Sequence, residues 1–293
     1  MKDDWRRANV DAIIQMLSVA IKAEKPWVKF GISPFGVWRN KDKDQEGSYT
    51  KGGQTNYDDL YADILKWLKM GWIDYVAPQL YWERGHRLVD YDILLNWWSQ
   101  HGYGRQVYIG HGAYRIGSSA AWKNPNELPA QVEEARTLNT VQGSIFYSAS
   151  SFKGNPLGIE DIFRNRLYKY PALRPIMDWL PKQTPEPPYF VDAFERPGFL
   201  EIHWADNDTS GHTKQYVLYR FEQNEPVNVS DPTKILGIIQ QSGAPEFKDR
   251  TYVKGKIYTY VVTALDRMQN ESQQDEPLRM EIKNGRTVFL FEP

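Results

Sequence analysis

The sequence predicts an α/β fold followed by an all-β fold: about half of a TIM-type β/α barrel, and then a β-sandwich. Three observations lead to this prediction. Helix and strand patterns alternate over residues 4–168, which is typical of parallel β/α units. Residues 181–188 are rich in proline and form a stiff linker. Beyond them, short strand patterns follow one another between turn residues. We therefore expect a partial barrel over residues 1–180 and a sandwich over residues 189–293.

The first helix is expected at residues 4–24. Asp3 or Asp4 can cap its start, and Lys25-Pro26 ends it. Its apolar residues recur at helical spacing at Val10, Ile13, Ile14, Leu17 and Ile21. A strand at 28–34 follows, and a long polar loop then runs to Gly53. Loops of this length after a strand are usually functional or disordered.

Three further helix and strand pairs repeat this order. Leu60, Ile64, Trp67 and Leu68 mark a helix, and so do Trp97 and Trp98 with Asp90 as N-cap. The expected helices lie at 56–70, 90–101, 127–139 and 159–168, and the expected strands at 73–82, 106–110 and 143–148. Because parallel strands end at the same edge of a barrel, the residues that follow them form its active-site mouth.

The strand at 73–82 is the centre of this pattern. Val76 and Leu80 lie on one face, which suits packing against helices, and Gln79 and Tyr81 lie on the other. A buried amide and phenol need partners, so they either meet a ligand or satisfy each other within the fold. The residues expected at the strand ends are Trp38, Arg39, Gln79, Tyr81, Trp82, Glu83, His111, Tyr114, Arg115 and Ser148.

The composition limits the classes of function. The 293 residues include 36 basic and 37 acidic side chains, so no basic excess indicates nucleic acid or an anionic membrane. Aromatic residues make up 14% of the chain, which weakly favours carbohydrate binding, although a large aromatic core explains the same excess. There are no cysteines, which excludes disulfides and thiolate metal sites. The five histidines have no ligand spacing, so we expect neither a metal nor a cofactor.

No targeting or membrane segment is expected. Met1 is followed by Lys-Asp-Asp-Trp rather than by an apolar run, so the pattern of a signal peptide is absent. No stretch is long and apolar enough to predict a transmembrane helix.

The second domain is expected to contain strands at 188–194, 199–204, 214–221, 235–240, 257–264 and 286–291. Residues 199–204 (FLEIHW), 216–219 (YVLY) and 255–266 (GKIYTYVVTALD) resemble a fibronectin type III domain. The resemblance implies that Trp204 is the core tryptophan. It also implies that Tyr258 is a corner tyrosine whose hydroxyl bonds to backbone upstream.

The first domain resembles the bacterial glycosyl-hydrolase-like family ten, also called domain of unknown function 187. The resemblance is carried by residues 4–11 (DWRRANVD), 25–40 (KPWVKFGISPFGVWRN), 57–63 (YDDLYAD), 73–82 (IDYVAPQLYW) and 107–110 (VYIG). It implies a β/α barrel and a secreted or surface-anchored glycosidase, in some members acting on peptidoglycan glycan strands. In the family four barrel strands precede this segment, the fourth ending in an acidic pair, so we expect the chain to be the C-terminal part of such a protein.

Glycoside hydrolysis normally needs two carboxyl groups flanking the scissile bond. Asp58, Asp59 and Asp63 are expected at a helix start, where carboxylates serve the helix dipole. Asp74 lies at the wrong strand end, and Asp11 is expected to face outward from its helix. Glu83 and Asp4 are the remaining candidates, and either is equally well read as a solvated charge. We therefore expect part of the catalytic machinery to be missing from this chain.

The polar and aromatic strand ends are better read as a sugar-binding surface. Trp38 and Trp82 can stack on pyranose rings, while Arg39 and Arg115 can donate to hydroxyl or carboxylate oxygens. His111 is a candidate proton shuttle or a structural histidine. The remaining candidates, which would orient hydroxyl groups, are Gln79, Tyr81, Tyr114 and Ser148.

The sequence thus predicts part of a glycoside hydrolase that acts on a bacterial or dietary glycan in the cell envelope or outside the cell. The alternative is a non-catalytic surface module that binds carbohydrate or protein. Half a barrel leaves its first and last strands, 28–34 and 143–148, without partners. We expect a second copy of the chain to supply them, giving a homodimer.

Overall fold

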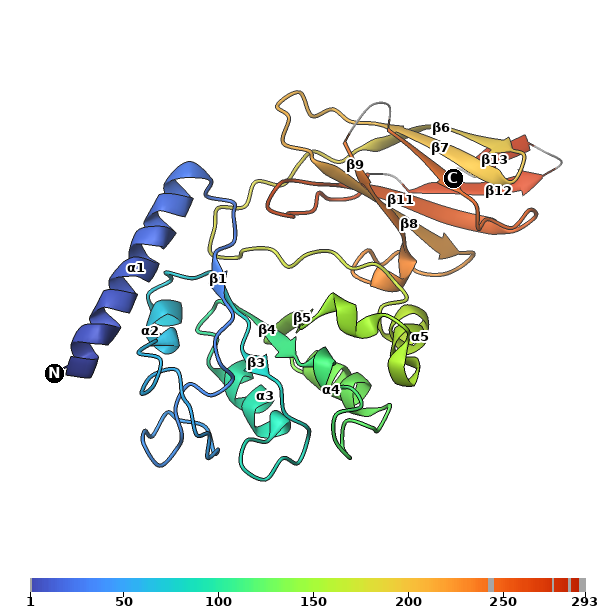
Figure 1. Ribbon diagram of the computed structural model, residues 1–293. Helices are drawn as coiled ribbons and strands as arrows, with labels where there is room; N and C mark the ends of the chain where they lie inside the picture. Colours follow the sequence, from blue (N-terminus) through green and yellow to red (C-terminus); the bar gives the residue numbers. More distant parts are fainter. Residues whose placement is uncertain (1, 242–244, 276, 284–285, 290–293) are drawn as a thin grey trace. The chain divides into compact units, whose positions relative to one another are not determined.

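A computed structural model describes residues 2–241, 245–275, 277–283 and 286–289. The chain divides into two compact units, Met1–Lys169 and Tyr170–Pro293 (Figure 1). Each unit is described by itself below.

Unit 1 contains helices and parallel strands in alternation. Its elements are α1 (Lys2–Glu24), β1 (Gly31–Ile32), α2 (Ile64–Lys69), β2 (Tyr75–Val76), β3 (Gln79–Leu80), α3 (Tyr91–Gln100), β4 (Gln106–His111), η1 (Ala113–Arg115), α4 (Glu127–Arg136), β5 (Val141–Phe146), η2 (Ala149–Phe152), η3 (Pro156–Gly158), α5 (Ile159–Ile162) and the π-helical η4 (Phe163–Leu167). The alternation predicted from the sequence is confirmed, and the elements are shorter than predicted.

Two of the shortened elements have visible causes. The helix predicted at 56–70 begins only at Ile64, because the side chain of Asp63 caps it by accepting a hydrogen bond from the amide of Lys66 at 3.3 Å. The strand predicted at 73–82 is divided into β2 and β3 around Pro78, which has no amide hydrogen to donate to the sheet.

The strands of unit 1 form one parallel sheet. β1 pairs with β2, β2 and β3 both pair with β4, and β4 pairs with β5. Within the described residues β1 and β5 are therefore the edge strands. Because β3, β4 and β5 run parallel, their carboxyl ends share one edge of the sheet. Helix α3 contacts β3 and β4, and α4 contacts β5 (Figure 1).

The core of unit 1 lies between the sheet and its helices. The completely buried side chains of Val76, Leu80, Val107 and Ile109 point from the sheet into this layer. Trp98 packs among them and donates a hydrogen bond from its indole to the carbonyl of Gly36 at 2.7 Å. The helix-facing role predicted for Val76 and Leu80 is confirmed.

Helix α1 attaches to α2 through a buried carboxylate. Asp11 accepts hydrogen bonds from the indole of Trp67 and the ammonium of Lys66, each at 2.6 Å. The prediction that Asp11 faces outward was wrong, because apolar residues surround most of this helix and do not define its buried side. The polar contact selects the buried side instead and leaves an exposed apolar set at Trp5, Ile13, Met16, Leu17 and Val19.

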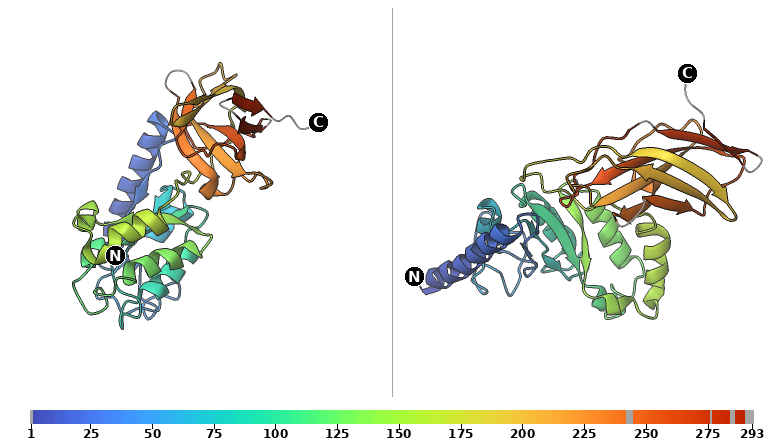
Figure 2. Two further views of the ribbon diagram at one scale, coloured as in Figure 1. Left: turned by 90° about the vertical axis from the view of Figure 1, so that its right-hand side faces the viewer. Right: turned by 90° about the horizontal axis from the view of Figure 1, so that it is seen from above.

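Unit 2 consists of antiparallel strands. These are β6 (Tyr189–Arg196), β7 (Phe199–Ala205), β8 (Gln215–Glu222), β9 (Ile235–Gln240), β10 (Glu246–Asp249), β11 (Ile257–Leu265), β12 (Leu278–Lys283) and β13 (Arg286–Phe289), with a short helix η5 (Pro232–Lys234). They form a sheet of order β10-β7-β6 and a sheet of order β13-β12-β11-β8-β9. Figure 2 shows these strands from two further directions.

The six strands predicted for this region all appear, and β10 and β12 were not predicted. Residues 290–291 of the last predicted strand lie outside the described residues. Trp204 is buried in the core, as predicted. The hydroxyl of Tyr258 accepts a hydrogen bond from the amide of Val253 at 3.2 Å, which is the upstream backbone contact predicted for this tyrosine.

Across the described residues, the structure contains no helix whose length and apolar character would let it cross a bilayer.

Candidate functional site

Three tyrosines meet at the carboxyl edge of the parallel sheet. Tyr81 follows β3, Tyr114 lies in η1 after β4, and Tyr147 follows β5. The ring of Tyr81 stacks with Tyr147 at a centroid distance of 6.3 Å and meets Tyr114 edge-on at 5.7 Å. Tyr114 is 50% exposed and Tyr147 is 61% exposed, so ring surface remains available to a ligand.

Backbone hydrogen bonds fix this tyrosine cluster. The amide of Tyr114 donates to the carbonyl of Tyr147 at 3.1 Å, and the amide of Tyr147 donates to the carbonyl of His111 at 3.0 Å. The pKa of Tyr81 is raised, first by partial burial and then by the neighbouring rings of Tyr114 and Tyr147. Tyr81 is therefore a neutral hydrogen-bonding phenol at neutral pH.

Arg115 approaches the cluster from η1. A Cβ atom added to Gly112 would lie 3.1 Å from Cγ of Arg115 and 3.1 Å from Cβ of Tyr81, so the two side chains converge closely over this glycine. Nε of Arg115 is buried and has no hydrogen-bond partner among the described residues. A buried donor without a partner costs about 1–3 kcal/mol.

Gln79 and Ser148 also lie at this edge. The side-chain nitrogen Nε2 of Gln79 donates to the backbone carbonyl of Ser33 at 3.1 Å, which ties β3 to the end of β1. Ser148 caps η2, and its hydroxyl lies 2.7 Å from that of Ser150. The sheet thus brings together Gln79, Tyr81, Tyr114, Arg115 and Ser148 from the residues predicted for the site.

His111 lies on the opposite side of the sheet. Its ring is completely buried between Tyr91 and Phe146, with Nε2 3.0 Å from the hydroxyl of Ser144 and Nδ1 3.3 Å from Oε1 of Gln131. Burial lowers its pKa to about 4, so the ring is neutral at pH 7. In this position it has no access to a substrate at the tyrosine cluster.

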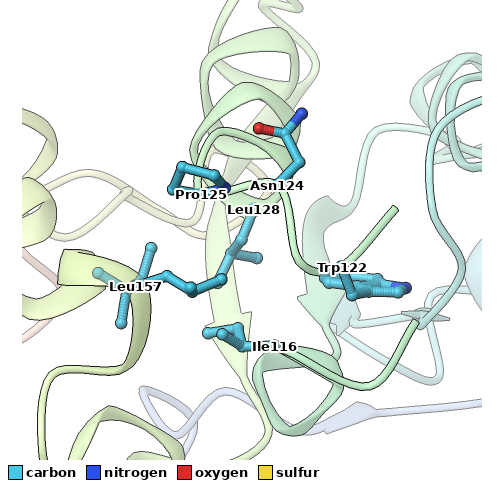
Figure 3. Close-up of a pocket in the computed structure, with 7 residues that line it drawn as sticks. Ile116, Trp122, Asn124, Pro125, Leu128 and Leu157 are labelled. Carbon is cyan, nitrogen blue, oxygen red and sulfur yellow. The ribbon is translucent and has the colours of Figure 1, made fainter. Parts of the chain in front are cut away.

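Glu83 is held by a tryptophan. Its Oε2 accepts a hydrogen bond from the indole of Trp122 at 3.2 Å. Trp122 also lines a small, mainly apolar hollow together with Ile116, and Figure 3 labels both side chains. The other residues that line the hollow are Asn124, Pro125, Leu128, Leu157 and Ile159.

Trp38 and Arg39 are engaged within the fold. Trp38 is 4% exposed and stacks on Trp97, so its ring face is covered. Arg39 binds Asp58 through Nε and Nη2 at 2.9 and 2.8 Å, and Asp44 through Nη1 at 2.9 Å. The pKa of Arg39 is raised, mainly because its guanidinium donates hydrogen bonds to Asp58.

Trp82 and Asp4 complete the set of predicted residues. Trp82 is partly buried and meets Phe35 edge-on at 5.4 Å. Asp4 lies exposed in the first turn of α1, where it pairs with Arg7 at 2.6 Å.

The sequence reasoning missed Tyr147 and Gln131. Tyr147 shares the alternation of Gly143 and Ile145, and that period-two pattern could have placed its ring beside Tyr81. Gln131 gave no signal, because a glutamine within a helix is usually exposed.

The cluster presents chemical groups that occur in sugar-binding sites. Aromatic faces, a phenol and a guanidinium suit hydroxyl and carboxylate oxygens on an apolar ring. Two flanking carboxyl groups are the usual requirement for glycoside hydrolysis, and Glu83 is the one predicted catalytic residue that follows a sheet strand of unit 1.

Comparison with known proteins supports this chemistry. Residues 1–126 match the family model described as glycosyl hydrolase-like 10. The chain is 41% identical over 278 residues to the glycosyl hydrolase YngK of Bacillus subtilis, covering 92% of this chain and 54% of YngK. It is 43% identical over 155 residues to the glycosyl hydrolase DigH of Escherichia coli K12, covering 50% of this chain and 35% of DigH.

Similar solved structures include a β-1,2-glucanase from Parabacteroides distasonis, with 20% identity over 35% of this chain and 14% of that chain. An Fn3-like protein from Clostridium thermocellum is 15% identical over 35% of this chain and 97% of that chain. Both have a TM-score of 0.27.

The chain spans about half the length of YngK and about a third of DigH. Residues 1–126 therefore match the glycosyl hydrolase-like 10 family model, and the chain is similar to parts of the curated glycosyl hydrolases YngK and DigH.

Proposed function

We propose that unit 1 is the carboxyl-terminal part of a glycoside hydrolase β/α barrel, and that its tyrosine cluster binds the glycan. The observation that carries the proposal is the meeting of Tyr81, Tyr114 and Tyr147 at the carboxyl edge of a parallel sheet, where barrel enzymes bind their substrates. The homology to YngK and DigH supports hydrolysis of a glycosidic bond as the activity of the whole protein.

The proposed substrate is a peptidoglycan-type glycan strand or a dietary polysaccharide. The guanidinium of Arg115, whose side chain converges with that of Tyr81, favours a glycan that presents an acceptor oxygen beside the aromatic faces. A peptidoglycan substrate would place the protein in the cell envelope or outside the cell.

Hydrolysis needs a pair of carboxyl groups, and we propose that at least one comes from outside this chain. Glu83 is a candidate for one of them, since Trp122 orients its carboxylate through a single oxygen and leaves the other to act. Asp4 is the second predicted candidate, and its pairing with Arg7 on α1 favours a structural role.

Unit 2 is proposed to be a fibronectin type III-like sandwich. The two antiparallel sheets, the buried Trp204 and the backbone contact of Tyr258 support this assignment.

The test is hydrolysis and binding of glycans. This chain and full-length YngK are incubated with purified peptidoglycan glycan strands and with a panel of neutral and acidic polysaccharides, and reducing ends are measured. Binding of the same glycans to this chain is measured by calorimetry. We expect this chain to bind the glycan that full-length YngK cleaves, with little or no cleavage of its own.

Two outcomes would change the proposal. Binding by this chain to a glycan that full-length YngK leaves intact would favour the alternative, a non-catalytic carbohydrate-binding module. Failure of this chain to bind any glycan that full-length YngK cleaves would remove the tyrosine cluster as the binding site.

A further inference from the structure

A histidine and two glutamates gather on the outer face of the β10-β7-β6 sheet in unit 2. Along β7, Leu200, Ile202 and Trp204 point into the core, so the alternating residues Glu201 and His203 point outward. Trp204 and its neighbours thus fix the outward direction of both polar side chains.

The register of the sheet brings a third donor beside them. Glu246 of β10 pairs directly with His203 of β7. One donor atom from each of Glu201, His203 and Glu246 lies within 4.8 Å of the others, and Nε2 of His203 is 3.1 Å from Oε1 of Glu201. Among the residues that the structure describes, no other three histidine or carboxylate side chains gather this closely.

The geometry points to a divalent transition-metal site, of the kind that binds Zn²⁺, formed by Glu201, His203 and Glu246. Zinc binds imidazole nitrogen and carboxylate oxygen at about 2.0–2.2 Å, so donors around one ion lie about 3–4 Å apart. The observed spacing approaches that range, and the exposed side chain of Glu246, which is ion-paired only with the exposed Lys248, can rotate to close the remaining gap. Three protein ligands leave a fourth position for water.

The neighbouring charges are compatible with this role. Arg196 donates to Oε2 of Glu201 at 2.9 Å, leaving Oε1 directed at His203. Lys248 pairs with Glu246 at 3.3 Å. Ligating carboxylates are commonly oriented by such outer partners.

A third carboxylate lies next to the group. Asp192 of β6 pairs with His203 on the side opposite Glu246, so one row across three strands reads Asp192, His203, Glu246. Paired residues share a face of the sheet, with Cβ atoms about 4.5–5.5 Å apart. Three carboxylates therefore face the two cations Arg196 and Lys248, and an additional positive ion is electrostatically favoured.

Bound metal would tie β10 to β7. β10 is an edge strand of its sheet within the described residues, and Glu246 is its first residue. Coordination across the two strands would hold that edge in place, because metal binding to the folded state stabilises it by mass action.

The experiment is calorimetric titration of the full chain with Zn²⁺, with Mg²⁺ as a hard-cation comparison. We expect one Zn²⁺ per chain and no comparable Mg²⁺ binding. His203→Gln and Glu246→Gln are each expected to weaken this binding at least ~10-fold. The matched control is His212→Gln, which removes an imidazole of the same unit outside the group and should leave the affinity unchanged.

Amide hydrogen exchange gives a second, local measurement. Saturating Zn²⁺ should slow exchange in β10 of the unmodified chain and of His212→Gln, and should leave β10 of His203→Gln unchanged. Absence of saturable Zn²⁺ binding to the unmodified chain would overturn the site. So would equal affinity in His203→Gln and the unmodified chain, since the metal would then be bound elsewhere.

Discussion

The side-chain oxygen of Gln131 lies 3.3 Å from Nδ1 of His111, behind the sheet that carries the tyrosine cluster. The amide nitrogen of Gln131 donates to the carbonyl of Trp82 and to Oε1 of Glu127, both at 3.0 Å. Its oxygen can only accept, so Nδ1 of His111 carries the hydrogen and Nε2 accepts from the hydroxyl of Ser144. One buried glutamine therefore sets the tautomer of the histidine.

Replacing Gln131 should destabilise unit 1. Gln131→Ala leaves Nδ1 of His111 and the carbonyl of Trp82 without their buried partner, whereas Oε1 of Glu127 still accepts from the amide of Arg84. Each of the two losses costs about 1–3 kcal/mol, so we expect the free energy of unfolding to fall by about 2–6 kcal/mol, measured by urea denaturation. Gln54→Ala, at an exposed position, is the control and should change the midpoint little. An unchanged midpoint for Gln131→Ala would contradict the network.

Acid should weaken unit 1 through His111. Burial lowers the pKa of this imidazole from 6.5 to about 4, so the unfolded chain takes up a proton at a pH where the folded chain does not. This contribution to stability is complete above pH 6.5 and is lost as the pH falls towards 4, by about 3 kcal/mol in all. Below pH 4 the folded state also binds the proton, and the loss stops growing.

The measurement is urea unfolding of the chain and of His111→Gln between pH 7.5 and 4. Because the variant has no titrating group at this position, the difference in unfolding free energy between the two proteins should shrink as the pH falls. A difference that stays constant across this range would show that His111 is accessible to protons in the folded state.

Asp11 should anchor α1 to α2. In Asp11→Ala the indole of Trp67 loses its acceptor and remains buried, so the free energy of unfolding should fall by about 1–3 kcal/mol. Asp42→Ala removes a carboxylate at an exposed position and serves as the control. Equal unfolding curves for the two variants would contradict an anchoring role, and circular dichroism would show whether α1 is retained.

Glycan binding should depend on the ring of Tyr147. Tyr147→Ala removes a 61% exposed ring from the cluster, and loss of one stacking contact of about 1 kcal/mol should weaken glycan affinity about fivefold. Tyr147→Phe keeps the ring and should retain most of the affinity. Tyr49→Ala removes a 75% exposed tyrosine of the same unit and should bind like the unmodified chain. Equal affinity for all three would place the glycan elsewhere.

The chain is proposed to form a homodimer. β1 and β5 are edge strands within the described residues, and exposed apolar residues such as Met16 and Val19 lie along α1. Sedimentation equilibrium should give about twice the chain mass of 34.2 kDa. A stable monomer at micromolar concentration would refute the dimer.

Much of the fold follows from local patterns. Period two along residues 73–82 predicted that Val76 and Leu80 face the helices, and it also aligned Gln79 with Tyr81. Local patterns did not predict a short polar strand or the burial of an aromatic residue after a strand. Strand β10 has only four residues, Glu246–Asp249, and its polar sequence resembles a loop. Trp38 and Tyr81 were both predicted at the carboxyl ends of strands, yet Trp38 stacks on Trp97 inside the core.

The sequence by itself determined the alternation of helices and strands, the change to antiparallel strands after residue 188, and the family of residues 1–126. These depend on which residues recur at which spacing, and that information is local. Only the tertiary structure decided that His111 is buried and neutral, that Asp11 holds Trp67, and that Glu246 lies beside His203. Each depends on the register between segments far apart in the chain, which packing fixes once the segments have met.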